Sequence, residues 1–212
     1  MTPDRSTTLV VVPAFNESDC IAAVVADVHQ AGFRCLVVDD GSVDDTSRRA
    51  TDAGADVVVL PINLGVGGAL RTGFRYAIDH GYDVVVQVDA DGQHLAEHID
   101  ELLVALDQGD LDMVVGSRFA AGGSHPEVSM VRRSCMHLLS GVIGKVEHGR
   151  MSDPTSGFRA IRRPLLDAFA RDFPHHYLGD TFEALYVAER RGYRLGEIPV
   201  TMRARQGGRP SA

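Results

Sequence analysis

The sequence is poor in several residue types that mark specialised protein classes. Its 212 residues include three cysteines, no tryptophan and a single lysine, Lys145. Cys20, Cys35 and Cys135 are too few and too widely spaced for a disulfide framework or a zinc site, and they suit a reducing cytosol. The longest apolar runs, such as 9–12, fall far short of the roughly 18–20 residues of a membrane span. The first eight residues lead into no apolar segment of a secretory signal. The composition therefore predicts a globular, cytoplasmic protein.

Charge is unevenly distributed along the chain. The formal net charge of −8 argues against nucleic-acid binding. Residues 1–110 include 6 basic and 19 acidic residues, whereas residues 111–212 include 15 basic and 10 acidic residues. Nearly all the basic residues are arginines, whose planar guanidinium suits phosphate groups. Either the second half faces an anionic ligand, or the arginines reflect only the base composition of the genome.

The first half alternates strands and helices. Short Val-rich runs predict strands over 9–14, 34–38, 56–60, 82–88 and 111–115. Helical segments between them are predicted over 21–30, up to residue 52, over 65–80 and over 95–108. Continuous apolar strands between helices are typical of a mostly parallel sheet that is covered on both faces. The predicted fold class is therefore α/β, doubly wound and Rossmann-like.

The second half is less regular. It predicts an amphipathic helix over 128–146, a strand over 156–161, a helix over 181–191, a strand over 193–202 and a flexible tail over 206–212. Neither an internal repeat nor an interdomain linker is visible, so we expect one domain over residues 1–212.

Polar clusters follow three of the predicted strands. They are Pro13–Glu17, Asp39–Ser42 and Asp89–His94. Open α/β sheets bind ligands at the carboxyl ends of their strands, so these clusters are expected to converge. Asp39 and Asp40 are suited to accept hydrogen bonds from a base or ribose, although a simple turn with a helix cap explains them too.

Asp89 and Asp91 form the sharpest motif. They follow a buried strand, where two ionised carboxylates are costly unless a cation or solvent compensates them. Carboxylates, an amide such as Gln93 and phosphate oxygens are the usual ligands of Mg²⁺, and Mn²⁺ takes similar ones. The alternative is a solvated turn that caps the next helix. The second acidic strand end nearby favours the metal.

The glycine-rich segment 63–68 does not indicate a dinucleotide site. It has Leu70 where G-x-G-x-x-G needs its third glycine, and it follows the third predicted strand rather than the first. We expect its glycines to allow close approach of the backbone to a ligand.

Seven segments, in order, resemble family 2 glycosyltransferases. They read VVVPAFNE, VVDDGSVDDT, NLGVGGALRTGF, VVVQVDADGQH, DMVVGSRF, DPTSGFRAIRR and RGYRLGEIPV. The resemblance runs from about Leu9 to Arg205 and is greatest to the branch of dolichol-phosphate mannosyltransferases and other polyprenyl-phosphate glycosyltransferases. It implies a GT-A fold, a nucleoside-diphosphate sugar donor of the GDP-mannose or UDP-glucose type, Mg²⁺ or Mn²⁺, and inversion at the anomeric carbon.

The resemblance also implies roles for individual residues. It assigns the nucleotide sugar to Pro13, Phe15, Glu17, Asp39, Asp40, Gly41, Asp89, Ala90 and Asp91. It assigns the metal to Asp89, Asp91 and Gln93. It assigns the acceptor phosphate to Arg118, Arg132, Arg133 and Arg205. The segment that begins at Arg205 reads RQGGRPS and lacks the lysine of the family pattern R-x-x-G-x-S-K, which puts the role of this segment in question.

Two kinds of acceptor remain open. An acceptor phosphate is already ionised and needs arginines such as Arg118, whereas a sugar hydroxyl needs a carboxylate base such as Asp180 or Glu183. Asp180 also precedes a predicted helix, where it would act as a cap. The apolar residues of 128–146 are suited to rest on a membrane surface. We therefore expect a polyprenyl phosphate acceptor, approached at the cytosolic face of the membrane, with Asp91 and Arg118 as catalytic residues and Asp180 as the base in the alternative.

Two other classes compete with glycosyl transfer. A sugar nucleotidyltransferase would carry a basic Gly-rich loop after the first strand, where this chain has Phe15-Asn16-Glu17. A non-catalytic nucleotide-sugar-binding protein would not need the intact acidic pair.

Overall fold

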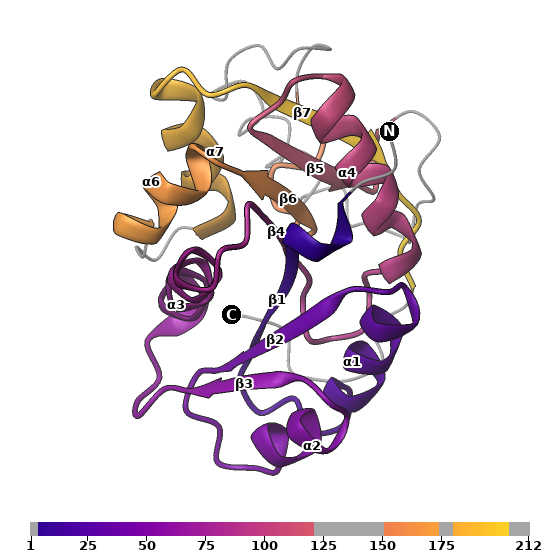
Figure 1. The fold of residues 1–212 in the computed structure, drawn as a ribbon, viewed down its shortest axis with the longest axis vertical. Helices are drawn as coiled ribbons and strands as arrows, with labels where there is room; N and C mark the ends of the chain where they lie inside the picture. Colours follow the sequence, from indigo (N-terminus) through magenta and orange to yellow (C-terminus); the bar gives the residue numbers. More distant parts are fainter. Residues whose placement is uncertain (1–3, 121–150, 174–179, 204–212) are drawn as a thin grey trace, which may run out of the picture.

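The computed structural model describes residues 4–120, 151–173 and 180–203, with backbone alone at 180 and 181 (Figure 1). The predicted amphipathic helix over 128–146 and the predicted tail lie outside the described residues. So do Arg132, Arg133 and Arg205.

A seven-stranded mixed sheet forms the centre of the molecule, with the strand order β3-β2-β1-β4-β6-β5-β7. The strands are β1 (Thr8–Ala14), β2 (Arg34–Asp39), β3 (Asp56–Val59), β4 (Val84–Gln87), β5 (Met113–Ser117), β6 (Arg159–Arg162) and β7 (Leu195–Pro199). All pairings are parallel except those of β6, which lies antiparallel between β4 and β5. The predicted α/β class is confirmed, and the sheet joins strands from both halves of the chain.

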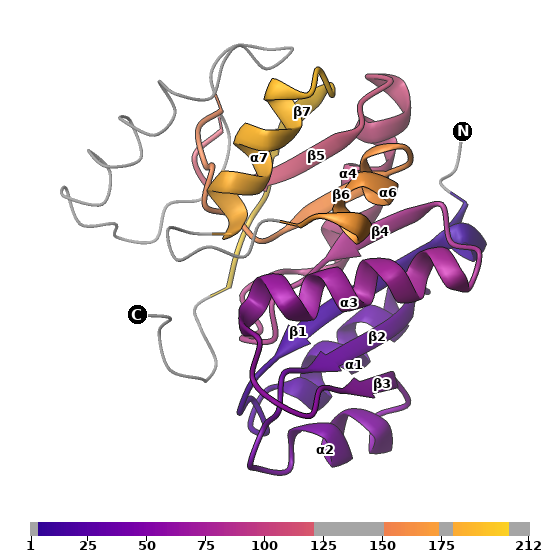
Figure 2. The same ribbon diagram turned by 90° about the vertical axis from the view of Figure 1, so that its left-hand side faces the viewer.

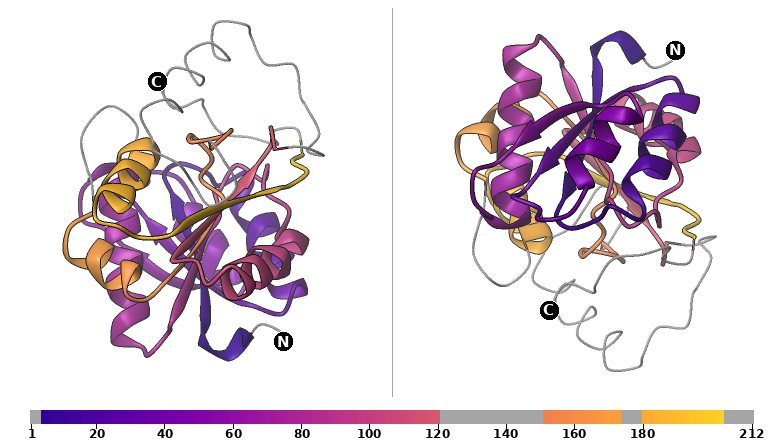
Figure 3. Two further views of the ribbon diagram at one scale, coloured as in Figure 1. Left: turned by 90° about the horizontal axis from the view of Figure 1, so that it is seen from above. Right: turned by 90° about the horizontal axis from the view of Figure 1, so that it is seen from below.

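Helices cover both faces of this sheet, as Figures 2 and 3 show. They are α1 (Ile21–Gln30), α2 (Thr46–Asp52), α3 (Gly65–Asp79), α4 (Ile99–Gln108), α6 (Leu165–Arg171) and α7 (Asp180–Arg190), with 3-10 turns η1 (Arg5–Thr7) and η2 (Ala96–His98). Sequence reasoning missed α6, which has only seven residues and so shows little periodicity. None of the helices in the described ranges is long and apolar enough to cross a bilayer.

Side chains along the central strand β1 alternate between two cores. Leu9 and Val11 pack with α3, α6 and α7, whereas Val10 and Val12 pack with α1 and α4. All four side chains are fully buried. Each such side chain contributes about 1.5–3 kcal/mol of hydrophobic stabilisation, so a strand that is apolar at every position is stable only between two helical layers.

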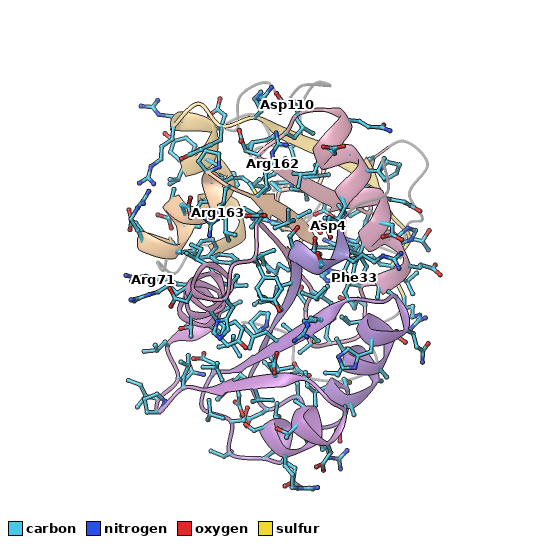
Figure 4. All side chains as sticks on the ribbon, viewed as in Figure 1. Asp4, Phe33, Arg71, Asp110, Arg162 and Arg163 are labelled. Atoms are coloured by element: carbon cyan, nitrogen blue, oxygen red, sulfur yellow. The ribbon has the colours of Figure 1, made fainter. Side chains whose placement is uncertain are left out.

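Ion pairs connect the start of β5 with the end of β6 and the start of β7 at one edge of the sheet. Asp110 accepts a hydrogen bond from Arg162 and forms an ion pair with Arg194, with N–O distances of 2.6 and 2.5 Å. These partners lower the pKa of Asp110 below its usual value. Figure 4 labels Asp110 and Arg162 near this edge of the sheet. The opposite edge, where β5 ends at Ser117, carries the polar residues of the candidate site.

We predict that Gly73→Ala destabilises the fold, because α3 packs closely on β1. A Cβ at residue 73 would lie 2.4 Å from Cγ1 of Val11. Overpacking of this kind costs about 1–3 kcal/mol, which exceeds the gain of up to about 1 kcal/mol that alanine brings to a helix. Urea unfolding measures the difference. Arg75→Ala, on the exposed side of the same helix, is the control and should change the free energy of unfolding by less than about 0.5 kcal/mol. A stabilised Gly73→Ala variant would contradict the packing.

Candidate active site

The first two predicted clusters meet at the carboxyl ends of β1 and β2. The backbone N–H of Asn16 donates to Ser42 Oγ, and the Asn16 side-chain oxygen accepts from the N–H of Val43, both at 2.9 Å. The N–H of Glu17 donates to Thr46 Oγ1, also at 2.9 Å. Since β4 pairs with the other side of β1, the third cluster emerges at the same edge. The predicted convergence is confirmed.

Asp39 and Asp40 lie below these loops, with exposed fractions of 1% and 3%. Asp39 accepts hydrogen bonds from the N–H of Ser42, at 2.8 Å, and from the Ser47 hydroxyl. Asp40 accepts from the N–H groups of residues 64 and 65, at 2.7 and 2.8 Å. Burial raises the pKa of Asp40 above its usual value, although these two hydrogen bonds act in the opposite direction. Both carboxylates therefore organise the surrounding loops.

Gly41 brings the loops after β2 and β3 together. Its φ is +77°, in the left-handed region that favours glycine. A Cβ there would also lie 3.1 Å from the Asn63 nitrogen and from the Ile62 carbonyl carbon. The glycine-rich turn thus approaches the Asp40 carboxylate, which accepts from the backbone N–H groups of Leu64 and Gly65.

A closed turn holds Asp89 and Asp91 at the end of β4. The N–H of Asp89 donates to His94 Nδ1 at 3.1 Å, and Oδ1 of Asp91 accepts from the N–H of Gln93 at 3.0 Å. Gly92, between Asp91 and Gln93, turns the chain with a φ of +73°. His94 is buried, with 7% of its surface exposed, so it fixes this turn from below. Sequence reasoning gave His94 no role.

The donor atoms of this turn fit a hard divalent cation. The Asp89 side chain is 39% exposed. Its contacts in the described part of the chain are long, 3.5 Å to Gln87 Nε2 and 3.8 Å to His94 Nε2. The described residues contain no group of three or more His, Cys, Asp or Glu side chains that could hold a metal alone. Two carboxylates and the Gln93 amide match Mg²⁺, which typically binds one or two carboxylates and completes its shell with phosphates and water.

Arg118 follows β5 and is held by a buried carboxylate that sequence reasoning missed. Its Nε and Nη2 donate to Asp153 at 2.8 and 3.1 Å. The side chains are 17% and 0% exposed. Burial lowers the pKa of Arg118, but hydrogen bonding and the charges of Asp153, Asp89 and Asp91 raise it overall. The guanidinium is therefore a fixed positive charge that interacts with the charges of Asp89 and Asp91 as well as with Asp153.

The loop that contains Asp153 is anchored at both ends. Glu197 on β7 accepts hydrogen bonds from the N–H groups of Ser152 and Asp153, at 3.0 and 2.8 Å. At the other end Arg159, 1% exposed, donates to the carbonyls of Ser156 and Pro154. Burial lowers the pKa of Arg159 to about 10. The predicted strand start at 156 is wrong, since residues 153–158 form this loop and β6 begins at Arg159. DPTSGFR lies within one of the segments that resemble the family, but only the fold shows that this loop holds Arg118 through Asp153.

The end of the described chain passes the turn that holds Asp89 and Asp91. Met202 forms an isolated antiparallel bridge with His94, and the N–H of Arg203 donates to the Gln93 carbonyl at 2.9 Å. Arg205, two residues later, lies outside the described residues. Asp180 is the first residue of α7, one residue before the predicted helix start, and its side chain is not described. Of the predicted acceptor arginines, Arg118 is the one that the described residues include.

The remaining predicted residues line the same edge. Pro13 is half-buried, Ala90 is buried with 5% exposed, and the Phe15 side chain is 46% exposed at the end of β1. Phe15 therefore offers an accessible aromatic face beside the acidic residues.

Comparison with known proteins identifies the family of this chain. Residues 9–169 match the family model described as Glycosyl transferase family 2. The polyprenol monophosphomannose synthase of Mycolicibacterium smegmatis is 33% identical over 95% of this chain and 79% of its own length. The undecaprenyl-phosphate mannosyltransferase of Micrococcus luteus is 32% identical over 94% of this chain and 85% of its own.

A solved structure shares the fold. Glucosyl-3-phosphoglycerate synthase from Mycobacterium tuberculosis, in complex with Mn²⁺, uridine diphosphate and phosphoglyceric acid, superimposes with a TM-score of 0.71 and 25% identity. The match covers 97% of this chain and 74% of that one. Together with the converging strand ends and the Asp89–Asp91 turn, these matches show that the chain is an enzyme that belongs to glycosyltransferase family 2.

Proposed function

We propose that this enzyme transfers a hexose from a nucleoside-diphosphate sugar to a polyprenyl phosphate, with inversion and with a divalent metal. The observation that carries the proposal is the position of Arg118, a fixed cation whose charge acts on Asp89 and Asp91 at the edge where β1, β2 and β4 end. The named relatives, which act on polyprenol and undecaprenyl phosphate, support the acceptor.

The donor belongs to the half formed by residues 8–117. The exposed face of Phe15 suits stacking on a base. Asp39, Asp40 and Gly41 order the loops beside the nucleotide, and Pro13, Glu17 and Ala90 border it. The uridine diphosphate and Mn²⁺ bound by the structural neighbour support a nucleotide in this position.

The metal would be held by Asp89, Asp91 and Gln93. When bound, such a cation neutralises charge that develops on the leaving diphosphate, as a Lewis acid. Arg118, whose orientation is fixed by Asp153 before substrate arrives, instead positions the acceptor phosphate. The sugar is thus held with its leaving group on the side of the two carboxylates.

The acceptor half runs over residues 118–205. A phosphate oxygen attacks the anomeric carbon from the side opposite the diphosphate, and the developing positive charge on the sugar is oxocarbenium-like, as in other glycosyl chemistry. An ionised phosphate needs no general base, so positioning by Arg118, with Arg132, Arg133 and Arg205, suffices. A lipid acceptor requires that the protein rest on a membrane surface during turnover.

A hydroxyl acceptor is the second candidate, favoured by the structural neighbour that was crystallised with phosphoglyceric acid. In that case a carboxylate must take the proton of the hydroxyl. Asp180 at the start of α7 is the proposed base, with Glu183 one turn along the same helix.

Asp91→Asn tests the metal role. Loss of one negative ligand should lower transfer at least about a hundredfold, because a charge-stabilising group is removed. Nucleotide binding should also lose its dependence on Mn²⁺. Calorimetry with and without EDTA measures the second effect. Asp107→Asn, on the exposed side of α4, is the matched control and should behave as the wild type. Equal nucleotide affinity in EDTA, in Mn²⁺ and in Asp91→Asn would disprove the metal role.

Arg118→Ala and Asp180→Asn separate the two acceptors. If the acceptor is a lipid phosphate, Arg118→Ala should reduce transfer about a hundredfold or more while donor binding persists, and Asp180→Asn should retain turnover. The assay follows labelled sugar into a polyprenyl phosphate and into soluble sugars. An active Arg118→Ala with a dead Asp180→Asn would establish a hydroxyl acceptor instead.

Asp153→Asn tests how Arg118 is held. Removing one member of a buried ion pair leaves an uncompensated charge, at a cost of about 3–5 kcal/mol, so the variant should unfold at a lower urea concentration. Asp172→Asn removes a surface ion pair with Arg191, in which the Asp172 side chain is 74% exposed. This substitution should cost less than about 1 kcal/mol. Equal effects of the two substitutions would show that the Arg118–Asp153 pair is solvated.

A further inference from the structure

The segment Gly157–Arg159 lies directly against Asp89, the first of the two metal-site carboxylates. A Cβ added to Gly157 would lie 2.5 Å from Asp89 Oδ1, 2.6 Å from Oδ2 and 2.8 Å from the carboxyl carbon. Real Cβ atoms essentially never show contacts below 3.0 Å. Only glycine at position 157 therefore leaves room for the Asp89 carboxylate in this position. With any larger residue, either the backbone at 157 or the carboxylate must move.

The next residue holds the backbone of Asp89. Phe158 is fully buried, and its ring stacks on His94 with a centroid separation of 5.0 Å and an interplanar angle of 17°. His94 Nδ1 in turn accepts the N–H of Asp89. Gly157 thus sets the space for the Asp89 side chain, while Phe158 orients the ring that fixes its main chain.

Two anchors limit how far residue 157 can move. The Arg159 guanidinium donates to the Ser156 carbonyl at 2.8 Å and to the Pro154 carbonyl at 3.2 Å. The Ser156 hydroxyl donates to the Gly116 carbonyl at 2.7 Å. These bonds hold the backbone on the N-terminal side of Gly157. The clash of a methyl group at residue 157 is therefore relieved most readily by displacement of the Asp89 carboxylate, because this carboxylate has only long contacts among the described residues and is partly exposed.

We propose that Gly157 is a positioning residue that sets the orientation of the Asp89 carboxylate for the metal. The inference rests on the proposed metal role of Asp89. Mg²⁺ demands near-ideal octahedral geometry at about 2.0–2.1 Å, so even a small displacement of one ligand oxygen weakens binding. Gly157 touches neither metal nor substrate and acts through Asp89.

Gly157→Ala tests the proposal through metal affinity. Mn²⁺ is titrated alone, and again with UDP and with GDP, and free Mn²⁺ is followed by electron paramagnetic resonance. Loss of a supporting contact around a metal ligand typically weakens affinity about ten- to a hundredfold, and this is the expected result. The matched control is Gly196→Ala on β7, where the new Cβ would lie 2.3 Å from Leu111 Cδ1. It crowds the core elsewhere and should retain wild-type Mn²⁺ affinity.

A thermal double-mutant cycle with Asp89→Ala tests the contact without metal. Gly157→Ala should lower Tm in the wild-type background and much less in Asp89→Ala, where the crowded carboxylate is absent. Equal Tm losses in the two backgrounds, or unchanged Mn²⁺ affinity in Gly157→Ala, would overturn the proposal. If the cycle shows coupling but the wild type binds no Mn²⁺, the placement of Asp89 by Gly157 is supported and the proposed metal role fails.

Discussion

The compensation of negative charge at the carboxyl edge of the sheet is the constraint on which the site depends. Asp89 and Asp91 follow the buried strand β4 and are partly exposed, whereas Asp153 in the loop before β6 is fully buried. A buried carboxylate requires a cation or hydrogen bonds. Arg118 supplies a paired cation, and the buried Arg159 adds a second positive charge that acts on Asp89 and Asp153. A divalent cation would complete this balance and at the same time bind a diphosphate.

The direction of β6 in the sheet places the second of these positive charges. The strand β6 lies between β4 and β5 and runs antiparallel to both. Its first residue therefore lies at the edge where β4 and β5 end. Arg159 therefore reaches the underside of the acidic turn, and the preceding loop brings Asp153 to Arg118. A parallel strand in the same position would bring its last residues, rather than the loop before it, to the site.

Local sequence patterns were sufficient for the first half of the fold. Val-rich runs located β1 to β4, and the acidic strand ends located the loops that converge, because the carboxyl ends of parallel strands share one edge. The same reasoning missed Asp153, Arg159 and His94. Their roles come from contacts between segments distant in sequence, such as Arg118 and Asp153, which are 35 positions apart. The seven residues of α6 were missed because its sequence spans barely two turns, and the orientation of β6 was not encoded in its own four residues.

The central claim is that this edge of the sheet binds a nucleoside-diphosphate sugar and passes its hexose to a lipid phosphate. The most direct measurement is incubation of the protein with Mn²⁺, a polyprenyl phosphate and a panel of UDP- and GDP-sugars, with both products quantified. We expect release of one nucleoside diphosphate in equal amount to a polyprenyl-phosphate hexose of inverted anomeric configuration. Release of pyrophosphate from a nucleoside triphosphate and a sugar phosphate, or nucleotide-sugar binding with no product from any donor, would contradict it.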